Sequence, residues 1–347
     1  MSVISQLVAA AEKQGCSDIH ITVPNAHFRK DGRLFCAVRD KQALTAGALE
    51  ELLTDDAKAR LARGESFDYG VSASARVRLR VHLYPTQSGI AAAIRLLPMR
   101  VPSFQELGLP AVISQLSRLS SGLVIIAGPT GSGKSSTLAA MVSDIAERDG
   151  GHIVTIEEPV EYLFSHGKAL IHQREVGTDV ANFSHALVDA LREDPDVIMV
   201  GEMRDQKTIQ AALTAAETGH LVLSTLHTTS AAESIERIVD VFPAEGQRQI
   251  RTQLAAVIGG VVCQRLVPAI GGGRRPAHEV LVATSAVRSM IREGRTHQIP
   301  SVLQTGRDKG MHTLSTHLAS LVREGTVSRD TAMRFATDPE GLARLLD

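Results

Sequence analysis

The residues with the clearest chemistry lie in one glycine-rich segment near the middle of the chain. It fits the pattern G-x-x-x-x-G-K-[ST] at every position. Its glycines let backbone N–H groups fold around a phosphate, Lys134 offers a fixed positive charge, and Ser135 offers a hydroxyl to Mg²⁺. An apolar run at 123–127 precedes the segment, and a helical pattern from Lys134 to about Glu147 follows it with an N-terminus that favours an anion. The pattern predicts a chain that binds ATP and Mg²⁺ through Gly128, Pro129, Thr130, Gly131, Ser132, Gly133, Lys134, Ser135, Ser136 and Thr137.

A carboxylate follows a second apolar run. The strand pattern at 197–200 ends at Gly201-Glu202, so Gly201 stands where many ATPases with such a loop have an Asp for Mg²⁺. Glu202 is well placed to orient or deprotonate an attacking water. The alternative is that Glu202 only pairs with Arg204.

Three more acids and two histidines are candidates whose chemistry is less specific. Glu157, Glu158 and Glu161 follow the apolar run 152–156, and clustered carboxylates repel one another unless they are solvated or face a cation. We expect Mg²⁺ or a basic partner beside them, or else a solvated acidic loop. His220 and His227 are seven residues apart, which puts them at opposite ends of a strand and its loop, a poor arrangement for one metal ion. Taken alone, each is by default a buried, hydrogen-bonded polar residue.

The elements that must position these residues fall into two domains joined by a linker. Residues 1–98 are expected to form a small α+β domain with helices at 2–13 and 49–61 and strands at 17–23, 26–30, 34–38, 75–84 and 90–97. Arg78 and Arg80 share one face of the strand at 75–84. Residues 99–109 show little periodicity and are the expected linker. Residues 110–347 begin as a parallel α/β sheet, with strands at 122–127, 152–156, 197–200 and 221–224. After residue 231 the pattern predicts helices at 232–241, 247–264, 285–293, 311–323 and 328–335.

The composition limits the class of protein. The 347 residues carry 37 basic and 38 acidic side chains, a formal charge of −1, which disfavours nucleic acid as a partner. The three cysteines Cys16, Cys36 and Cys263 are too few and too far apart for a disulfide framework, so we expect reduced thiols. The N-terminus lacks a signal-peptide pattern, and no apolar run approaches the ~20 residues of a membrane helix. We expect a soluble protein of the cytoplasm.

Four segments in fixed order resemble one family, the secretion ATPases of type II and type IV systems. They are the loop at 128–135, the acidic stretch 156–161, the stretch 194–205 around Glu202, and the stretch 218–228 with both histidines. They match the family's Walker A, Asp box, atypical Walker B and His box. Segments 17–20, 240–243, 277–279 and 286–293 are similar to the branch of pilus retraction motors, and the last resembles the retraction motif A-I-R-N-L-I-R-E.

The resemblance implies a homohexamer with a PAS-like N-terminal domain and a RecA-like C-terminal P-loop domain, an overall α/β class. It implies ATP hydrolysis that powers type IV pilus retraction and twitching motility, at the cytoplasmic face of the inner membrane, with a pilus platform protein of that membrane as partner. Glu202 would be the catalytic glutamate, and Glu157, Glu158 and Glu161 would lie near Mg²⁺ and water. His220 and His227 would sense or position the nucleotide. Arg78 and Arg80 would reach the active site of a neighbouring subunit. The alternative interpretation is that these two arginines form only a solvated basic face of their strand.

Other functions predict different features. A pilus-assembly or type II secretion ATPase would carry a four-cysteine zinc site after the catalytic glutamate, and here only Cys263 follows Glu202. An accessory paralogue of the retraction motor would share the motifs seen here. A RecA-like nucleic-acid translocase would need a basic surface or stacking aromatics, and the chain has only 11 aromatic residues, 8 Phe and 3 Tyr with no Trp. A scaffold that binds nucleotide without hydrolysis would not need Lys134, Ser135 and Glu202 together.

Overall fold

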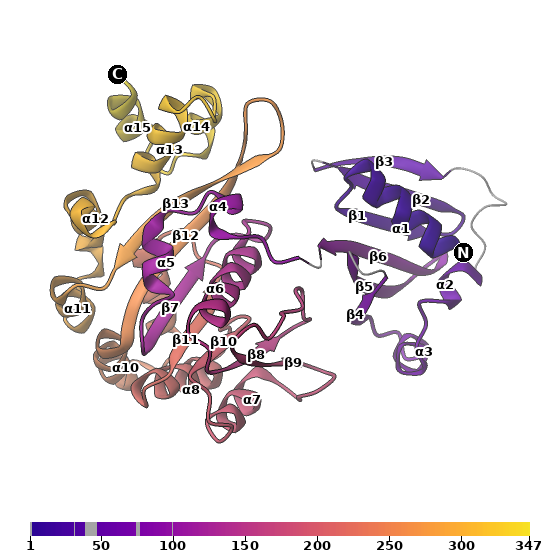
Figure 1. The fold of residues 1–347 in the computed structure, drawn as a ribbon, viewed down its shortest axis with the longest axis horizontal. Helices are drawn as coiled ribbons and strands as arrows, with labels where there is room; N and C mark the ends of the chain where they lie inside the picture. Colours follow the sequence, from indigo (N-terminus) through magenta and orange to yellow (C-terminus); the bar gives the residue numbers. More distant parts are fainter. Residues whose placement is uncertain (1, 31, 39–46, 74–76, 99) are drawn as a thin grey trace. The chain divides into compact units, whose positions relative to one another are not determined.

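The chain folds into two compact units (Figure 1). The computed structural model describes residues 2–30, 32–38, 47–73, 77–98 and 100–347. Unit 1 comprises Met1–Val101 together with Pro159–Leu163, and unit 2 comprises Pro102–Glu158 and Phe164–Asp347. Unit 1 therefore ends close to residue 98, but it also takes in a short segment from the middle of the chain that the sequence placed in the second domain.

Unit 1 is built on a six-stranded antiparallel sheet in the order β3-β2-β1-β6-β5-β4. Apolar and polar residues alternate along β5, so that one face of the sheet is buried and the other carries arginines. The buried face packs against the apolar side of α1 (Val3–Gln14). Ser2 caps the start of this helix, because its hydroxyl accepts the Ser5 N–H. The strands are β1 (Asp18–Thr22), β2 (Asn25–Lys30), β3 (Arg33–Val38), β4 (Phe67–Ser72), β5 (Val77–Thr86) and β6 (Gly89–Pro98).

Two predictions for unit 1 are corrected. The helix expected at 49–61 is two helices, α2 (Gly47–Glu50) and α3 (Asp55–Ala62), because the Thr54 hydroxyl accepts the Ala57 N–H and starts a new helix. Strand β4 was not predicted. The first two residues of the strand expected at 75–84 lie outside the described residues.

Unit 2 is built on a seven-stranded sheet in the order β13-β12-β7-β11-β10-β8-β9, parallel except for the antiparallel pair β12–β13. The strands expected at 122–127 and 197–200 have those bounds, and β9 and β13 were not predicted. The strands are β7 (Gly122–Ala127), β8 (His152–Glu157), β9 (Leu170–Glu175), β10 (Val197–Val200), β11 (Leu221–Leu226), β12 (Ile258–Pro268) and β13 (Arg274–Val282).

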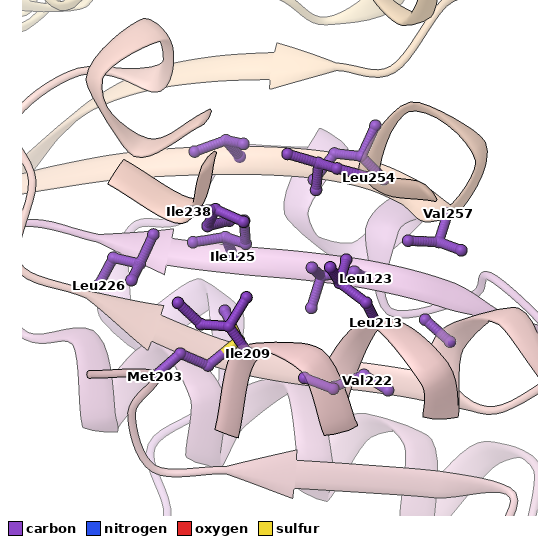
Figure 2. Close-up of a cluster of buried hydrophobic side chains, with 14 of the residues drawn as sticks. Leu123, Ile125, Met203, Ile209, Leu213, Val222, Leu226, Ile238, Leu254 and Val257 are labelled. Atoms are coloured by element: carbon purple, nitrogen blue, oxygen red, sulfur yellow. The ribbon is translucent and has the colours of Figure 1, made fainter. Parts of the chain in front are cut away.

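Helices cover both faces of this sheet. Helices α5 (Ala111–Leu116) and α6 (Lys134–Arg148) pack on one face. The other face is covered by α7 (Phe183–Ala190), α8 (Gln206–Glu217), α9 (Ala231–Asp240), α10 (Ala244–Val257), α11 (Ser285–Arg292) and α12 (Ile299–Thr305). Figure 2 shows this core, where Ile125 of β7 and Val222 of β11 lie among Leu213, Ile238 and Leu254 of three helices. Helices α13 (Leu314–Arg323), α14 (Arg329–Phe335) and α15 (Pro339–Leu346) form a smaller cluster beside β12 and β13.

The helix expected at 247–264 is wrong in its second half. Helix α10 ends at Val257, and the chain continues directly as the strand β12. Gly259 and Gly260 disfavour a helix, and the residues after them pair in parallel with β7. Burial on both faces makes β12 a continuous apolar run, which periodicity alone does not distinguish from a buried helix.

The expected linker at 99–109 contains a short helix, α4 (Phe104–Leu107). Ser103 and Glu106 form a reciprocal capping box around its first turn. None of the described helices is long and apolar enough to cross a membrane. The three cysteines are free thiols, as expected, and burial raises the pKa of Cys263.

Candidate nucleotide-binding and catalytic site

The candidate residues of unit 2 gather at one edge of its sheet, where parallel strands end side by side. Along the sheet order β7-β11-β10-β8, the strand ends lead into the loop at Gly128, into His227, into Gly201-Glu202 and into Glu158. Neighbouring strands lie about 4.8 Å apart, so these segments follow one another in a row. The carboxyl edge of a parallel sheet is where α/β proteins bind ligands.

The loop at 128–133 has the shape of an anion cradle. Gly128 has φ +146°, and a Cβ there would lie 2.3 Å from the Gln264 carbonyl oxygen, so only glycine fits. The Lys134 ammonium donates to the carbonyl oxygens of Gly128 (2.8 Å) and Pro129 (3.1 Å), which holds the charge over the loop. Pro129, Thr130 and Gly131 are exposed. These features fit a phosphate group, which would replace the two carbonyls as the partner of Lys134.

The three hydroxyl residues in the first turn of α6 differ in exposure. Ser135 is exposed, as a Mg²⁺ ligand must be, and Ser136 is half-buried. Thr137 is fully buried, and its hydroxyl donates to Gln264 Oε1 (2.8 Å). The prediction that Thr137 binds the nucleotide is therefore corrected for its side chain, which is buried and bonded to Gln264 on the core side of the loop.

Glu202 is held between Arg204 and His227. Its carboxylate lies 2.6 Å from Arg204 Nε on one oxygen and 3.3 Å from His227 Nε2 on the other, and its side chain is 13% exposed. Glu202 thus pairs with Arg204, and this is not its sole contact, since it also lies at the site edge beside His227. The Arg204 side chain is 71% exposed, so this partner is free to leave.

Contacts between the strands fix the backbone around Glu202. The Thr225 hydroxyl of β11 donates to the Gly201 carbonyl oxygen (2.6 Å), and the Met203 N–H donates to the Thr225 carbonyl oxygen (3.2 Å). Asp205 then caps α8 by accepting from the Thr208 N–H (3.0 Å) and hydroxyl (2.7 Å). Burial by itself would raise the pKa of Asp205, but these hydrogen bonds outweigh it and the pKa is lowered.

The three acids of the stretch 156–161 have different surroundings. Glu157 is buried, and its Oε1 accepts from the Thr155 hydroxyl (2.7 Å) and from Gln173 Nε2 (3.1 Å). Glu158 is exposed. Glu161 belongs to unit 1, where its Oε1 lies 3.9 Å from Arg80 Nη1. Of the two acids in unit 2, Glu158 is the one accessible to a solvated cation.

The structure separates His220 from the other candidates. His220 precedes β11 and His227 follows it, so the six residues of the strand, about 20 Å, lie between them. The Nδ1 of His220 contacts the Ala215 carbonyl oxygen (2.9 Å) and the Thr218 hydroxyl (3.1 Å) at the end of α8. Within the chain, the expected role of His220 at the nucleotide is therefore corrected to that of a helix-terminating residue.

Arg78 and Arg80 lie on the face of β5 opposite the core of unit 1. The Arg78 Nε donates to the Val160 carbonyl oxygen (3.0 Å), and the Arg80 Nε lies 3.7 Å from Asp68. Arg95 of β6 is the register partner of Arg80 and extends the same basic row. The Arg95 Nε donates to Asp18 Oδ1 (2.8 Å) within unit 1.

No described group of three or more His, Cys, Asp or Glu residues has the arrangement of a metal site.

Comparison with known proteins identifies the family. Residues 1–272 match the family model described as type II/IV secretion system protein. The chain belongs to this family.

Its relatives extend the likeness over nearly the whole chain. It is 42% identical to the type IV pilus retraction ATPase PilT of Pseudomonas aeruginosa, covering 97% of this chain and 99% of that protein. It is 33% identical to the type IV pilus ATPase PilU of the same organism, covering 98% and 90%. Among solved structures, the pilus retraction motor PilT with bound ADP superposes with a TM-score of 0.88 at 39% identity, covering 99% of each chain. The family and the α/β fold class expected from the sequence are confirmed.

Proposed function

We propose that this protein is an ATP-hydrolysing motor that powers retraction of a type IV pilus, and hence twitching motility. The observation that carries the proposal is the row formed by the phosphate loop, His227 and Glu202 along one sheet edge. The PilT relatives, one of them solved with ADP, support the same assignment.

The site residues have complementary roles in hydrolysis. Lys134 would turn from its two backbone carbonyls to the phosphates, and Ser135 would ligate Mg²⁺, which neutralises phosphate charge when bound. Glu202 would accept the proton of the attacking water on the oxygen that Arg204 now occupies. His227 would keep the carboxylate oriented through its other oxygen. Glu158 would lie near the cation as a solvated acid.

Assembly into a homohexamer completes the proposal. Arg78 and Arg80 would stabilise phosphate charge in a neighbouring subunit, and Glu161 would tune them through its ion pair with Arg80. The motor would act at the cytoplasmic face of the inner membrane on a pilus platform protein. Its α11, which includes most of the segment resembling the retraction motif, exposes Arg292, while Arg288 turns inward and donates to the carbonyl oxygens of Ala255 (2.7 Å) and Ala256 (2.6 Å) at the end of α10. These two arginines, four residues apart on α11, therefore differ, since Arg288 is tied to the end of α10 and Arg292 is exposed.

The experiment is a strain that carries only Glu202→Gln, compared with wild type, with a deletion and with the exposed control Glu340→Gln. Loss of a general base should lower ATP turnover by roughly a hundredfold or more. The cells should become hyperpiliated and lose twitching, while Glu340→Gln behaves as wild type.

Other outcomes point to other functions. Loss of pili would assign the chain to assembly or secretion. Unchanged piliation in the deletion, until a second motor is also removed, would make it an accessory paralogue. Unchanged turnover in Glu202→Gln would refute the catalytic role of Glu202.

A further inference from the structure

We infer that Gln264, a residue outside all recognised motifs, is a positioning residue for the phosphate-binding loop. It lies in β12, on the side of β7 opposite β11, one residue beyond the register pair Cys263–Ala127. Its side chain is 3% exposed and reaches the loop from more than a hundred residues away in sequence. This inference rests on the proposed nucleotide site.

Both ends of the Gln264 amide are used on the loop. Its Nε2 donates to the Ser132 carbonyl oxygen (2.7 Å), and its Oε1 accepts from the Thr137 hydroxyl (2.8 Å). The opposite orientation of the amide would set two carbonyl oxygens against each other at Ser132, so one orientation is selected. Gln264 therefore joins the loop to the first turn of α6.

The backbone of Gln264 and the glycines of the loop fit closely. A Cβ on Gly133 would lie 2.7 Å from Gln264 Nε2, just as a Cβ on Gly128 would strike the Gln264 carbonyl oxygen. At Gly128 the clash is with the Gln264 backbone, so contact with Gln264 excludes a Cβ there; at Gly133 a Cβ would displace the Gln264 amide from the loop, and the φ of +91° independently favours glycine. The backbone of the loop therefore packs directly against Gln264 at Gly128 and Gly133.

The hydrogen bond at Ser132 has a direct consequence for phosphate binding. In a planar trans peptide the C=O and the N–H point in opposite directions. When Gln264 holds the Ser132 carbonyl, it turns the Gly133 N–H away from β12. Without that hold the peptide can rotate and present its carbonyl to an anion, which would repel it. Gln264 thus pre-organises the donor that the phosphate needs.

A residue that pre-organises the loop should affect nucleotide binding more than the chemical step. Because the same loop contacts serve the ground state and the transition state, their loss raises KM and leaves kcat nearly unchanged. A residue that only fills the core would instead lower thermal stability without changing either constant.

The test measures ADP dissociation constants by calorimetry in the full-length protein. Gln264→Met keeps the length of the side chain and removes both hydrogen bonds, so it should weaken ADP binding roughly tenfold to thirtyfold, with kcat within about twofold of wild type. Val262→Ala, on the same strand and face and fully buried, is the matched control. It should lower Tm and leave ADP binding unchanged.

Thr137 provides a second route to the same contact. Thr137→Val removes the hydroxyl with little change in volume and should weaken ADP binding about threefold to tenfold, whereas Thr137→Ser should restore it. The double variant Thr137→Val with Gln264→Met should weaken ADP binding little more than Gln264→Met alone, because both substitutions remove the same contact. If Gln264→Met does not fold, the Val and Ser variants of Thr137 decide the question.

Two results would overturn the inference, and they differ in what else they overturn. If Lys134→Ala loses ADP binding while Gln264→Met and Thr137→Val bind ADP as wild type does, Gln264 is only a core residue. If Lys134→Ala also binds ADP as wild type does, the proposed nucleotide site is itself wrong.

Discussion

A cluster of three histidines, the buried His278 of β13 with the half-buried His312 and His317, predicts how this protein responds to acid. His317 stacks on His278 with ring centroids 5.0 Å apart, and the rings of His312 and His317 meet edge to face with centroids 5.2 Å apart. The Nδ1 of His317 accepts the backbone N–H of His278 (2.9 Å), so it must stay unprotonated. Burial, and to a lesser degree His312, lowers the pKa of His317 from 6.5 to about 4. Burial also lowers the pKa values of His278 and His312.

The sign and size of the effect follow from proton binding. Between about pH 6.5 and 4, His317 binds protons in the unfolded chain but not in the folded one. The free energy of unfolding therefore falls as pH falls through that window, and the contribution of His317 is fully present only above it. With these two pKa values, His317 alone accounts for a loss of about 2 kcal/mol between pH 7 and pH 5.

Urea unfolding of the wild type and of His317→Asn at the two pH values measures this contribution. The Asn carbonyl oxygen can accept the His278 N–H without titrating, so the difference in unfolding free energy between pH 7 and pH 5 should shrink by about 2 kcal/mol. The exposed His185 is the control, and His185→Asn should keep the wild-type difference. An unchanged difference in His317→Asn would refute the buried-imidazole reasoning.

Three smaller perturbations test single contacts of the site and of α11. Gly128→Ala adds a Cβ 2.3 Å from a backbone carbonyl of β12 and should weaken ADP binding roughly tenfold or more by calorimetry; wild-type affinity would contradict the fit. Arg204→Gln breaks the ion pair with Glu202. The Arg204 side chain is 71% exposed, so the pair contributes at most about 1 kcal/mol, and ATP turnover should stay within about fivefold of wild type. A larger fall in turnover would give Arg204 a direct role with Glu202. Arg288→Met removes two hydrogen bonds to the end of α10 and should lower the free energy of unfolding by about 1–3 kcal/mol. The exposed Arg292→Met should change it by less than about 0.5 kcal/mol. Equal effects of the two substitutions would contradict a stabilising role for the hydrogen bonds of Arg288.

Local patterns determined the parts of the site that are contiguous in the chain. The strand, loop and helix around Lys134 need only residues that follow one another, because the glycines, the lysine and the helix start act on one phosphate. The position of Glu202 could be read in the same way, since it directly follows the buried strand β10. The likeness to one family then supplied the fold class, which the comparisons confirm.

Tertiary structure decided what depends on neighbours distant in sequence. His220 and His227 lie at opposite edges of the sheet, because the parallel strand β11 runs between them. His227 therefore lies at the edge with the phosphate loop, and His220 lies at the opposite edge. Gln264 could not be found from its apolar surroundings, which fit a helix or a buried strand equally well until β12 paired with β7. Glu157 has its carboxylate tied to Thr155 and Gln173, whereas its neighbour Glu158 is exposed. The residue types were visible in the sequence, but the contacts of Glu157 with Gln173 and of Gln264 with Ser132 and Thr137 depend on sheet order, because backbone pairing joins strands that the chain itself keeps far apart.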